Sequence, residues 1–81
     1  MWQEDDQALK ATFSFRDFAE AFAFMTEVAF LAENQSHHPN WSNVWNTVEV
    51  TLTTHDAGDT VTEKDRIMAR GIDRIFEKYK Q

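Results

Sequence analysis

Cysteine is absent from this sequence of 81 residues, and proline and glycine are scarce, with one and two copies. Without cysteine, neither a disulfide framework nor a thiolate metal site can stabilise the chain. With only Gly58 and Gly71, it has no glycine-rich loop of the kind that cradles phosphate groups. No apolar run approaches the roughly 20 residues that span a bilayer, and the acidic start "MWQEDD" lacks the features of a signal peptide. We therefore expect a cytoplasmic protein without membrane contact, built as one domain over residues 1–81.

Basic residues are also few, since 8 Lys and Arg stand against 14 Asp and Glu for a net charge of −6. No basic cluster is present that could neutralise nucleic-acid phosphates, so direct nucleic-acid binding is not expected. Apolar residues are plentiful by contrast: they make up 42% of the chain, with seven Phe and three Trp, as is typical of a folded domain. A core this small is often completed by self-association, and the composition therefore favours a homo-oligomer.

Two stretches near the N-terminus predict a hairpin. In "ALKATFSF" apolar and polar residues alternate, which predicts a half-buried strand with Leu9, Ala11, Phe13 and Phe15 on one face. The preceding "WQEDDQ" predicts a short strand followed by a turn.

A long helix is predicted over residues 16–35, opened by a capping box of Ser14 and Asp17. Its apolar positions sweep about half of the circumference, which is wider than one sheet requires, and one phenylalanine lies outside even this arc. We interpret the surplus as a second buried contact, with another subunit. The alternative is a few exposed aromatic side chains without a role. The candidates for the subunit contact are Phe24, Phe30 and Leu31.

A second helix is predicted from "TEKD", where Thr62 and Asp65 have the spacing of a capping box. Gly71 lies on its apolar face and indicates close approach of a neighbouring element. The rest of that face consists of Ile67, Met68, Ile72, Ile75, Phe76 and Tyr79.

Two of the three histidines are adjacent in "ENQSHHPNWSNVW" and precede the only proline. The residue before proline is pushed out of the α region, so the first helix must end before His38, which becomes extended. His37 then falls in the corner between helix and strand. Because neighbouring side chains of an extended chain point in opposite directions, His37 and His38 are expected to flank a ligand.

The third histidine lies in "TLTTHDAGD", and a hairpin is expected to bring it to the other two. A two-residue turn at Asn46-Thr47 places His38 opposite His55. This register sorts apolar and polar residues onto separate faces, whereas a shift by one residue mixes them. Trp45 then lies on the apolar face, in the core or at an interface.

The histidine cluster has three interpretations: solvated surface residues, a metal site completed by Glu33, or general acid–base catalysis. Adjacent histidines with opposed side chains chelate zinc poorly, and no His-x-His or His-x3-His spacing is present. Imidazole titrates near neutrality, with a pKa of about 6.5, so it can both give and accept a proton. No serine lies in a recognisable nucleophile elbow. These residues favour proton transfer on a small neutral molecule, without a redox cofactor or a metal.

The spacing of these residues resembles a known family signature. Glu33, three residues, His37-His38-Pro39, five residues, Trp45, nine residues, His55, nine residues and Asp65 form a set similar to that of the pterin-4a-carbinolamine dehydratases. The stretches "FRDFAEAFAFMTEVAFLAE" and "VEVTLTTHDAG" also resemble this family, so the similarity covers nearly the whole chain. The resemblance implies an α+β fold: a two-layer β-β-α-β-β-α domain with both helices on one face of a four-stranded antiparallel sheet.

The resemblance also implies a reaction and a site. The reaction is dehydration of 4a-hydroxytetrahydropterin to quinonoid dihydropterin, in tetrahydropterin recycling, by a homodimer or homotetramer. The catalytic residues implied are His37, His38 and His55. The implied substrate contacts are Pro39 and the backbone near Thr54 and Asp56. Glu33 has three open roles: orienting His37, binding the amino-pyrimidine edge of the pterin, or simple solvation.

Some implications are less direct. Asp65 belongs to the signature, but its place in a capping box explains it structurally, and we assign it no catalytic role. Trp2 stands where relatives place a tryptophan near the pterin. Some relatives are interaction proteins instead, as dimerisation partners of a transcription factor or as assembly factors. A non-catalytic module of this kind is the competing function, although it would not need all three histidines.

Overall fold

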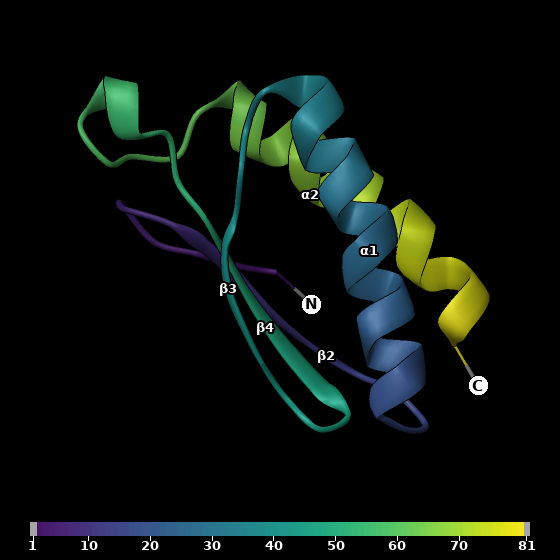
Figure 1. Ribbon diagram of the computed structural model, residues 1–81. Coiled ribbons are helices and arrows are strands. Elements are labelled where there is room, and N and C mark those ends of the chain that lie inside the picture. The colour runs from purple at the N-terminus through teal and green to yellow at the C-terminus, as the bar shows by residue number, and fades with distance from the viewer. Residues whose placement is uncertain (1, 81) are drawn as a thin grey trace.

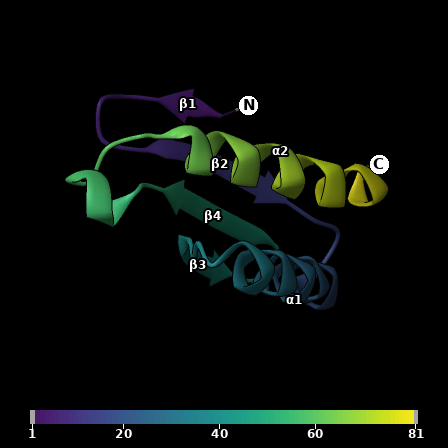
Figure 2. The ribbon, with the colours of Figure 1, turned by 90° about the horizontal axis from the view of Figure 1, so that it is seen from above.

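The computed structural model describes residues 2–80, which form a two-layer domain of four strands and two main helices. The order along the chain is β-β-α-β-β-α, and the strands form one antiparallel sheet in the order β1-β2-β4-β3. Both helices cover the same face of the sheet, and they run side by side in opposite directions (Figures 1 and 2). The fold implied by the sequence resemblance is therefore confirmed. The elements are β1 (Gln3–Glu4), β2 (Leu9–Ser14), α1 (Phe18–Gln35), β3 (Asn40–Val44), β4 (Thr47–Leu52), α2 (Glu63–Phe76) and the 3-10 turns η1 (His55–Ala57) and η2 (Glu77–Tyr79).

Strand β2 lies at the centre of the core, as its alternating sequence predicts. Every second residue of β2 is buried, namely Leu9, Ala11 and Phe13. These residues pair with the buried Leu52, Val50 and Val48 of β4. The predicted first hairpin is also present, because β1 pairs with β2 in antiparallel register.

Helix α1 begins two residues later than predicted, with Asp17 as its N-cap. The Asp17 carboxylate accepts a hydrogen bond from the backbone N–H of Glu20 at 2.9 Å. The predicted capping box of Ser14 and Asp17 is wrong, because Ser14 is the last residue of β2 and pairs with Thr47. The side chain of Glu20 completes the start of the helix by accepting from the backbone N–H of Arg16 at 2.8 Å.

The apolar side chains of α1 divide between the core and the surface. Phe24 is fully buried, with its ring centre 5.1 Å from that of Phe13, so its predicted place at a subunit contact is wrong. Leu31 is half-buried against the core and touches α2. The exposed aromatic side chains of the helix are Phe18, Phe22 and Phe30, of which Phe30 is 74% exposed.

The β3–β4 hairpin turns one residue earlier than predicted. Its two-residue loop is Trp45-Asn46, so Trp41 faces Val50. Each residue of β3 therefore pairs with a β4 residue two positions earlier than predicted. A shift by two residues keeps the side chains on the predicted faces, but His38 does not lie opposite His55. Trp45 has a φ of 50° and is 63% exposed, so it is not a core residue of this chain.

Side-chain amides explain this turn. Asn43 donates from its amide to the backbone oxygens of Trp45 and Thr47, at 3.1 and 2.9 Å. The side-chain amide of Asn46 donates to the backbone oxygen of Phe15 at 3.0 Å, and the backbone carbonyl of Asn46 accepts from the N–H of Phe15 at 2.8 Å. These bonds hold an aromatic residue at positive φ, a conformation that bulky side chains rarely adopt.

Helix α2 follows its prediction closely. The capping box of Thr62 and Asp65 is present. Gly71 approaches α1 as expected, since a Cβ atom there would lie 2.8 Å from Cδ2 of Leu31. Ile67 is the exception on the predicted apolar face, because it is 46% exposed. Within residues 2–80, neither helix has the length and apolar character that crossing a bilayer requires.

Trp2 is held in place by the core. Its indole N–H donates to Asp73 of α2 at 2.8 Å, and its ring lies edge-on to Phe13 at 5.8 Å. Asp73 lies two helical turns beyond Asp65, so within this chain Trp2 serves the packing of α2 on the sheet.

Candidate functional site

The end of α1 is shaped by a Schellman motif, which places His37 at the corner. Ser36 adopts the left-handed conformation, with a φ of 51°, and its N–H donates to Glu33 O at 3.2 Å. The N–H of His37 donates to Ala32 O at 3.1 Å, which completes the motif. As predicted, the helix ends before His38-Pro39, and the chain then enters β3.

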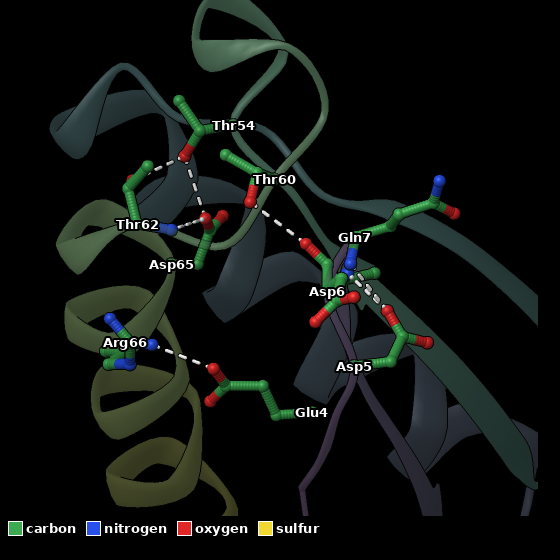
Figure 3. Close-up of polar contacts among 10 residues, drawn as sticks. Glu4, Asp5, Asp6, Gln7, Thr54, Thr60, Thr62, Asp65 and Arg66 are labelled. Atoms are coloured by element: carbon green, nitrogen blue, oxygen red, sulfur yellow. Dashed lines mark hydrogen bonds and ion pairs between the residues drawn. The ribbon is translucent and has the colours of Figure 1, made fainter.

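His37 contacts a buried carboxylate. Its Nε2 lies 2.6 Å from Oδ1 of Asp65, a residue without solvent exposure. The other carboxylate oxygen accepts from the hydroxyl of Thr54 at 2.7 Å and from the N–H of Thr62 at 2.9 Å, as Figure 3 shows. Asp65 therefore serves both as the cap of α2 and as the partner of His37.

The electrostatics of Asp65 fix the hydrogen-bonding role of His37. Burial alone would raise the pKa of the Asp65 carboxyl, but the hydrogen bonds from Thr62, His37 and Thr54 outweigh it and lower the pKa below its ordinary value. An ionised carboxylate only accepts hydrogen bonds, so the Nε2 of His37 must carry the proton that it donates. When His37 is neutral, its Nδ1 is then the basic nitrogen.

His38 has a carboxylate partner as well. Its Nε2 lies 3.0 Å from Oε1 of Glu33, in the last turn of α1, and both side chains are exposed. Glu33 thus contacts His38 rather than His37.

His55 begins the turn η1 and pairs with Asp59, with 2.9 Å between Nδ1 and Oδ1. The turn needs left-handed backbone at Gly58, with a φ of 85°, and at Asp59, with a φ of 57°. The hydrogen bond with Asp59, followed by the negative charges of Asp59 and Asp56, raises the pKa of the exposed His55 imidazole.

The loop that carries His55 is tied to the turn between β1 and β2. The hydroxyl of Thr53 donates to Gln7 O at 2.6 Å, and the hydroxyl of Thr60 donates to Asp6 O at 2.9 Å. Figure 3 shows the second of these bonds. One bond lies on either side of His55, so the N-terminal turn limits the movement of the loop.

These segments surround one open depression of about 210 Å³. Its lining comes mainly from the end of α1, the loop at η1 and the start of α2. These segments lie at the same end of the molecule (Figure 1). All three histidines border the depression, which agrees with the prediction that the two histidine stretches meet. Its lining residues are Ser36, His37, His38, Thr53, Thr54, His55, Asp56 and Lys64.

Other predicted site residues lie differently. Glu33 and Pro39 are not part of this lining. The N–H of Thr54 donates to Thr60 O at 2.9 Å, and the carbonyl of Thr54 accepts from Ala57 and Asp59 at 3.2 and 3.1 Å. The backbone of Thr54 is therefore engaged within the protein, while its buried hydroxyl supports Asp65.

The sequence interpretation missed two carboxylates at this site. Asp65 was placed in the family signature but given only a capping role, since the spacing from Thr62 already explained it. Its contact with His37 joins residues 28 positions apart and has no local signal. Asp59 carried no signal at all, because its position depends on the left-handed backbone of the turn.

The arrangement suits acid–base chemistry better than metal binding. Each histidine faces its own carboxylate, and in residues 2–80 no group of three or more His, Asp and Glu side chains is placed to hold a metal ion. A larger depression of about 520 Å³ lies over β2 and β4 and has no histidine in its lining. The three imidazoles, which can exchange protons near neutral pH, all line the smaller depression.

Sequence comparison places the chain among known proteins. A family model described as "Pterin 4 alpha carbinolamine dehydratase" matches residues 1–75. A relative from Synechococcus sp. (strain WH7803), named for pterin-4-alpha-carbinolamine dehydratase, is 54% identical over 74 residues, which cover 91% of this chain and 78% of the relative. A relative from Bradyrhizobium sp. (strain ORS 278) with the same name is 57% identical over 76 residues, which cover 91% of this chain and 75% of the relative.

Solved structures agree with this placement. The crystal structure of a "transcriptional coactivator/pterin dehydratase" from Brucella melitensis is 45% identical, with a TM-score of 0.86, and the match covers 91% of this chain and 80% of that one. A pterin dehydratase-like protein described as a RuBisCO assembly factor in the alpha-carboxysome is 28% identical, with a TM-score of 0.74, and the match covers 93% and 86%. Sequence and structure together show that the chain belongs to the pterin-4-alpha-carbinolamine dehydratase family.

Proposed function

We propose that this protein dehydrates a pterin-4a-carbinolamine to the quinonoid dihydropterin, using His37, His38 and His55. The observation that carries the proposal is the common depression bordered by three histidines, each with a different carboxylate partner. Asp59 raises the pKa of the His55 imidazole, while Asp65 accepts from Nε2 of His37 and leaves its Nδ1 free to accept a proton, so the site offers both an acid and a base.

In the proposed reaction the C4a–O bond breaks, N5 loses its proton, and a C4a–N5 double bond forms as water leaves. The departing oxygen needs a proton donor, and N5 needs an acceptor. We assign the donor role to His55, because Asp59 raises the pKa of its imidazole. We assign the acceptor role to Nδ1 of His37, whose Nε2 proton is held by Asp65 at 2.6 Å.

The remaining residues bind and position in this proposal. His38 is paired with Glu33. Its side chain and that of His37 contact the ligand from two different sides. The Asp56 carboxylate borders the depression and can accept from the amino-pyrimidine edge. Thr54 acts through Asp65 rather than by a backbone contact with substrate. Pro39 fixes the extended backbone of His38, and neither a cofactor nor a metal takes part.

A non-catalytic role is the second candidate. The solved relative described as a RuBisCO assembly factor matches 93% of this chain, so this fold accommodates such a role. Exposed Phe18, Phe22 and Phe30 offer apolar surface for a protein partner or a second copy of the chain. The three histidine–carboxylate pairs favour catalysis, since a binding surface on α1 would not require them.

A stopped-flow assay of carbinolamine decay separates the two candidates. We expect the purified chain to accelerate decay above the uncatalysed rate, in proportion to protein concentration. The His38→Ala/His55→Ala double variant is the matched control, because both side chains are exposed and the fold should be retained. Equal rates with wild-type chain, double variant and no protein would reject the catalytic proposal.

A further inference from the structure

A second depression adjoins the one that the histidines border. It has a volume of about 240 Å³ and is lined by Gln35, His37, Lys64 and Ile67. His37 and Lys64 line both depressions, so the two meet at these side chains.

The sizes of the two depressions favour one ligand that occupies both. Pockets that enclose small molecules generally measure about 300–1,000 Å³. The histidine depression, at about 210 Å³, falls below this range, whereas the two together fall within it. A bicyclic ring placed against the histidines would therefore leave the second depression for a substituent of that ring.

The lining of the second depression combines one apolar side chain with polar and charged ones. Ile67 is 46% exposed on α2, although its sequence position predicts a core residue. A single exposed isoleucine is ordinary, but this one lies beside the proposed catalytic His37. Gln35 provides an amide, and Lys64 provides an ammonium group.

The charged side chains at the two depressions favour an anionic substituent. Each of the three histidines already has a carboxylate partner within 3.0 Å. Within the described residues Lys64 forms no ion pair, and it is the one Lys or Arg side chain lining either depression. Its positive charge is therefore available to an anionic group of a ligand.

We propose that Gln35, Lys64 and Ile67 form a subsite for an anionic substituent on the pterin ring, with Lys64 binding the anion. This inference rests on the proposed function, since the ring must lie against the histidines. It predicts that an anionic pterin binds more tightly than a neutral one. The net charge of −6 opposes this preference, because the chain as a whole repels anions, so the preference would have to come from Lys64.

The experiment compares two pterins that differ in charge: 6-hydroxymethylpterin and its phosphate monoester. Isothermal titration calorimetry measures the dissociation constant of each with wild-type chain and with Lys64→Gln, Lys64→Arg and Lys10→Gln. The last variant removes an equal charge from the exposed sheet face and is the matched control. We expect wild-type chain to bind the phosphate ester about fivefold more tightly at low salt, the upper range for an exposed ion pair.

The outcomes separate the subsite from the proposed function. Lys64→Gln should bring the ratio of the two dissociation constants close to one, whereas Lys64→Arg and Lys10→Gln should retain the preference for the phosphate ester. Equal affinities for both pterins in wild-type chain would overturn the subsite and leave the proposed function intact. A preference that survives in Lys64→Gln would also overturn it, and no binding of either pterin would overturn the proposed function itself.

Discussion

The Nε2 of His37 lies 2.6 Å from a carboxylate oxygen of Asp65, which joins the end of α1 to the first turn of α2. Asp65 also caps α2 and accepts from Thr54, the residue before His55. One buried carboxylate thus connects two histidine segments that are separate in the sequence. The geometry of the site and the stability of the fold depend on the same group.

Removing a site histidine should slow the reaction. His38→Ala and His55→Ala should each reduce the dehydration rate by a factor of about 10² or more, as for loss of a positioned acid or base. The reduction in the double variant should be smaller than the product of the two single reductions if the residues act together. Stopped-flow rates measure the effect, with circular dichroism as the folding control. Well-folded single variants with wild-type rates would show that the reaction occurs elsewhere.

His37→Ala should differ from the other two variants. The sequence placed His37 only in the corner between helix and strand, whereas in the structure its side chain is 11% exposed and contacts Asp65. Its loss leaves the buried Asp65 with one hydrogen bond fewer, at a cost of about 1–3 kcal/mol. Urea unfolding should therefore show lower stability for His37→Ala than for His38→Ala or His55→Ala.

Asp59→Asn should alter the pH dependence of the reaction. Asp59 raises the pKa of His55, first through its hydrogen bond, so His55 remains protonated to higher pH. Without the negative charge this pKa falls, and the alkaline decline in rate should begin at lower pH. Asp56→Asn is the graded control, because the Asp56 charge is the smaller cause and its loss should shift the profile less. Identical profiles for the wild-type chain and Asp59→Asn would contradict the assignment of His55 as proton donor.

Asp65→Asn should destabilise the protein in a pH-dependent way. The pKa of Asp65 in the folded protein lies below the ordinary value of 3.8. The carboxylate therefore contributes fully to the free energy of unfolding at pH values above 3.8, and this contribution is lost as the pH falls through the folded pKa. At pH 7 the loss of hydrogen bonds to a buried group should cost about 1–3 kcal/mol. Urea unfolding at pH 7 and at pH 3 measures whether the gap to wild-type chain narrows in acid. Asp6→Asn, a change at an exposed carboxylate, controls for general charge effects.

Strand β2 and helix α2 were predictable because local pattern and tertiary packing agree there. Alternation placed Phe13 on the buried face, and the Thr62–Asp65 spacing identified the start of α2. The start of α1 was not predictable from the cap rule alone, because the strand pairing of Ser14 with Thr47 competes with its use as a cap. Asp17, predicted only as the partner of Ser14 in the capping box, therefore caps the helix itself.

The hairpin turn and the carboxylates required information that the sequence does not carry locally. Turn preferences disfavour a tryptophan at positive φ, and the Trp45 turn depends on side-chain bonds from Asn43 and Asn46. The correct faces were predicted nevertheless, because a pairing shift of two residues preserves the alternation. Asp59 was missed because its carboxylate reaches His55 only after the turn at Gly58 forms.

Self-association should depend on the exposed aromatic side chains of α1. Phe22 is 54% exposed and Phe30 is 74% exposed, while Phe24 is buried and cannot contribute directly. We expect analytical ultracentrifugation at micromolar concentration to show a species larger than the 9.5 kDa chain. Phe22→Asp/Phe30→Asp should shift the distribution towards the monomer, because burying a carboxylate at an apolar contact is unfavourable. Thr12→Asp, which adds charge to the exposed side of β2, should leave the distribution unchanged. A monomeric wild-type chain would contradict the prediction, and the exposed aromatic residues would then be ordinary surface.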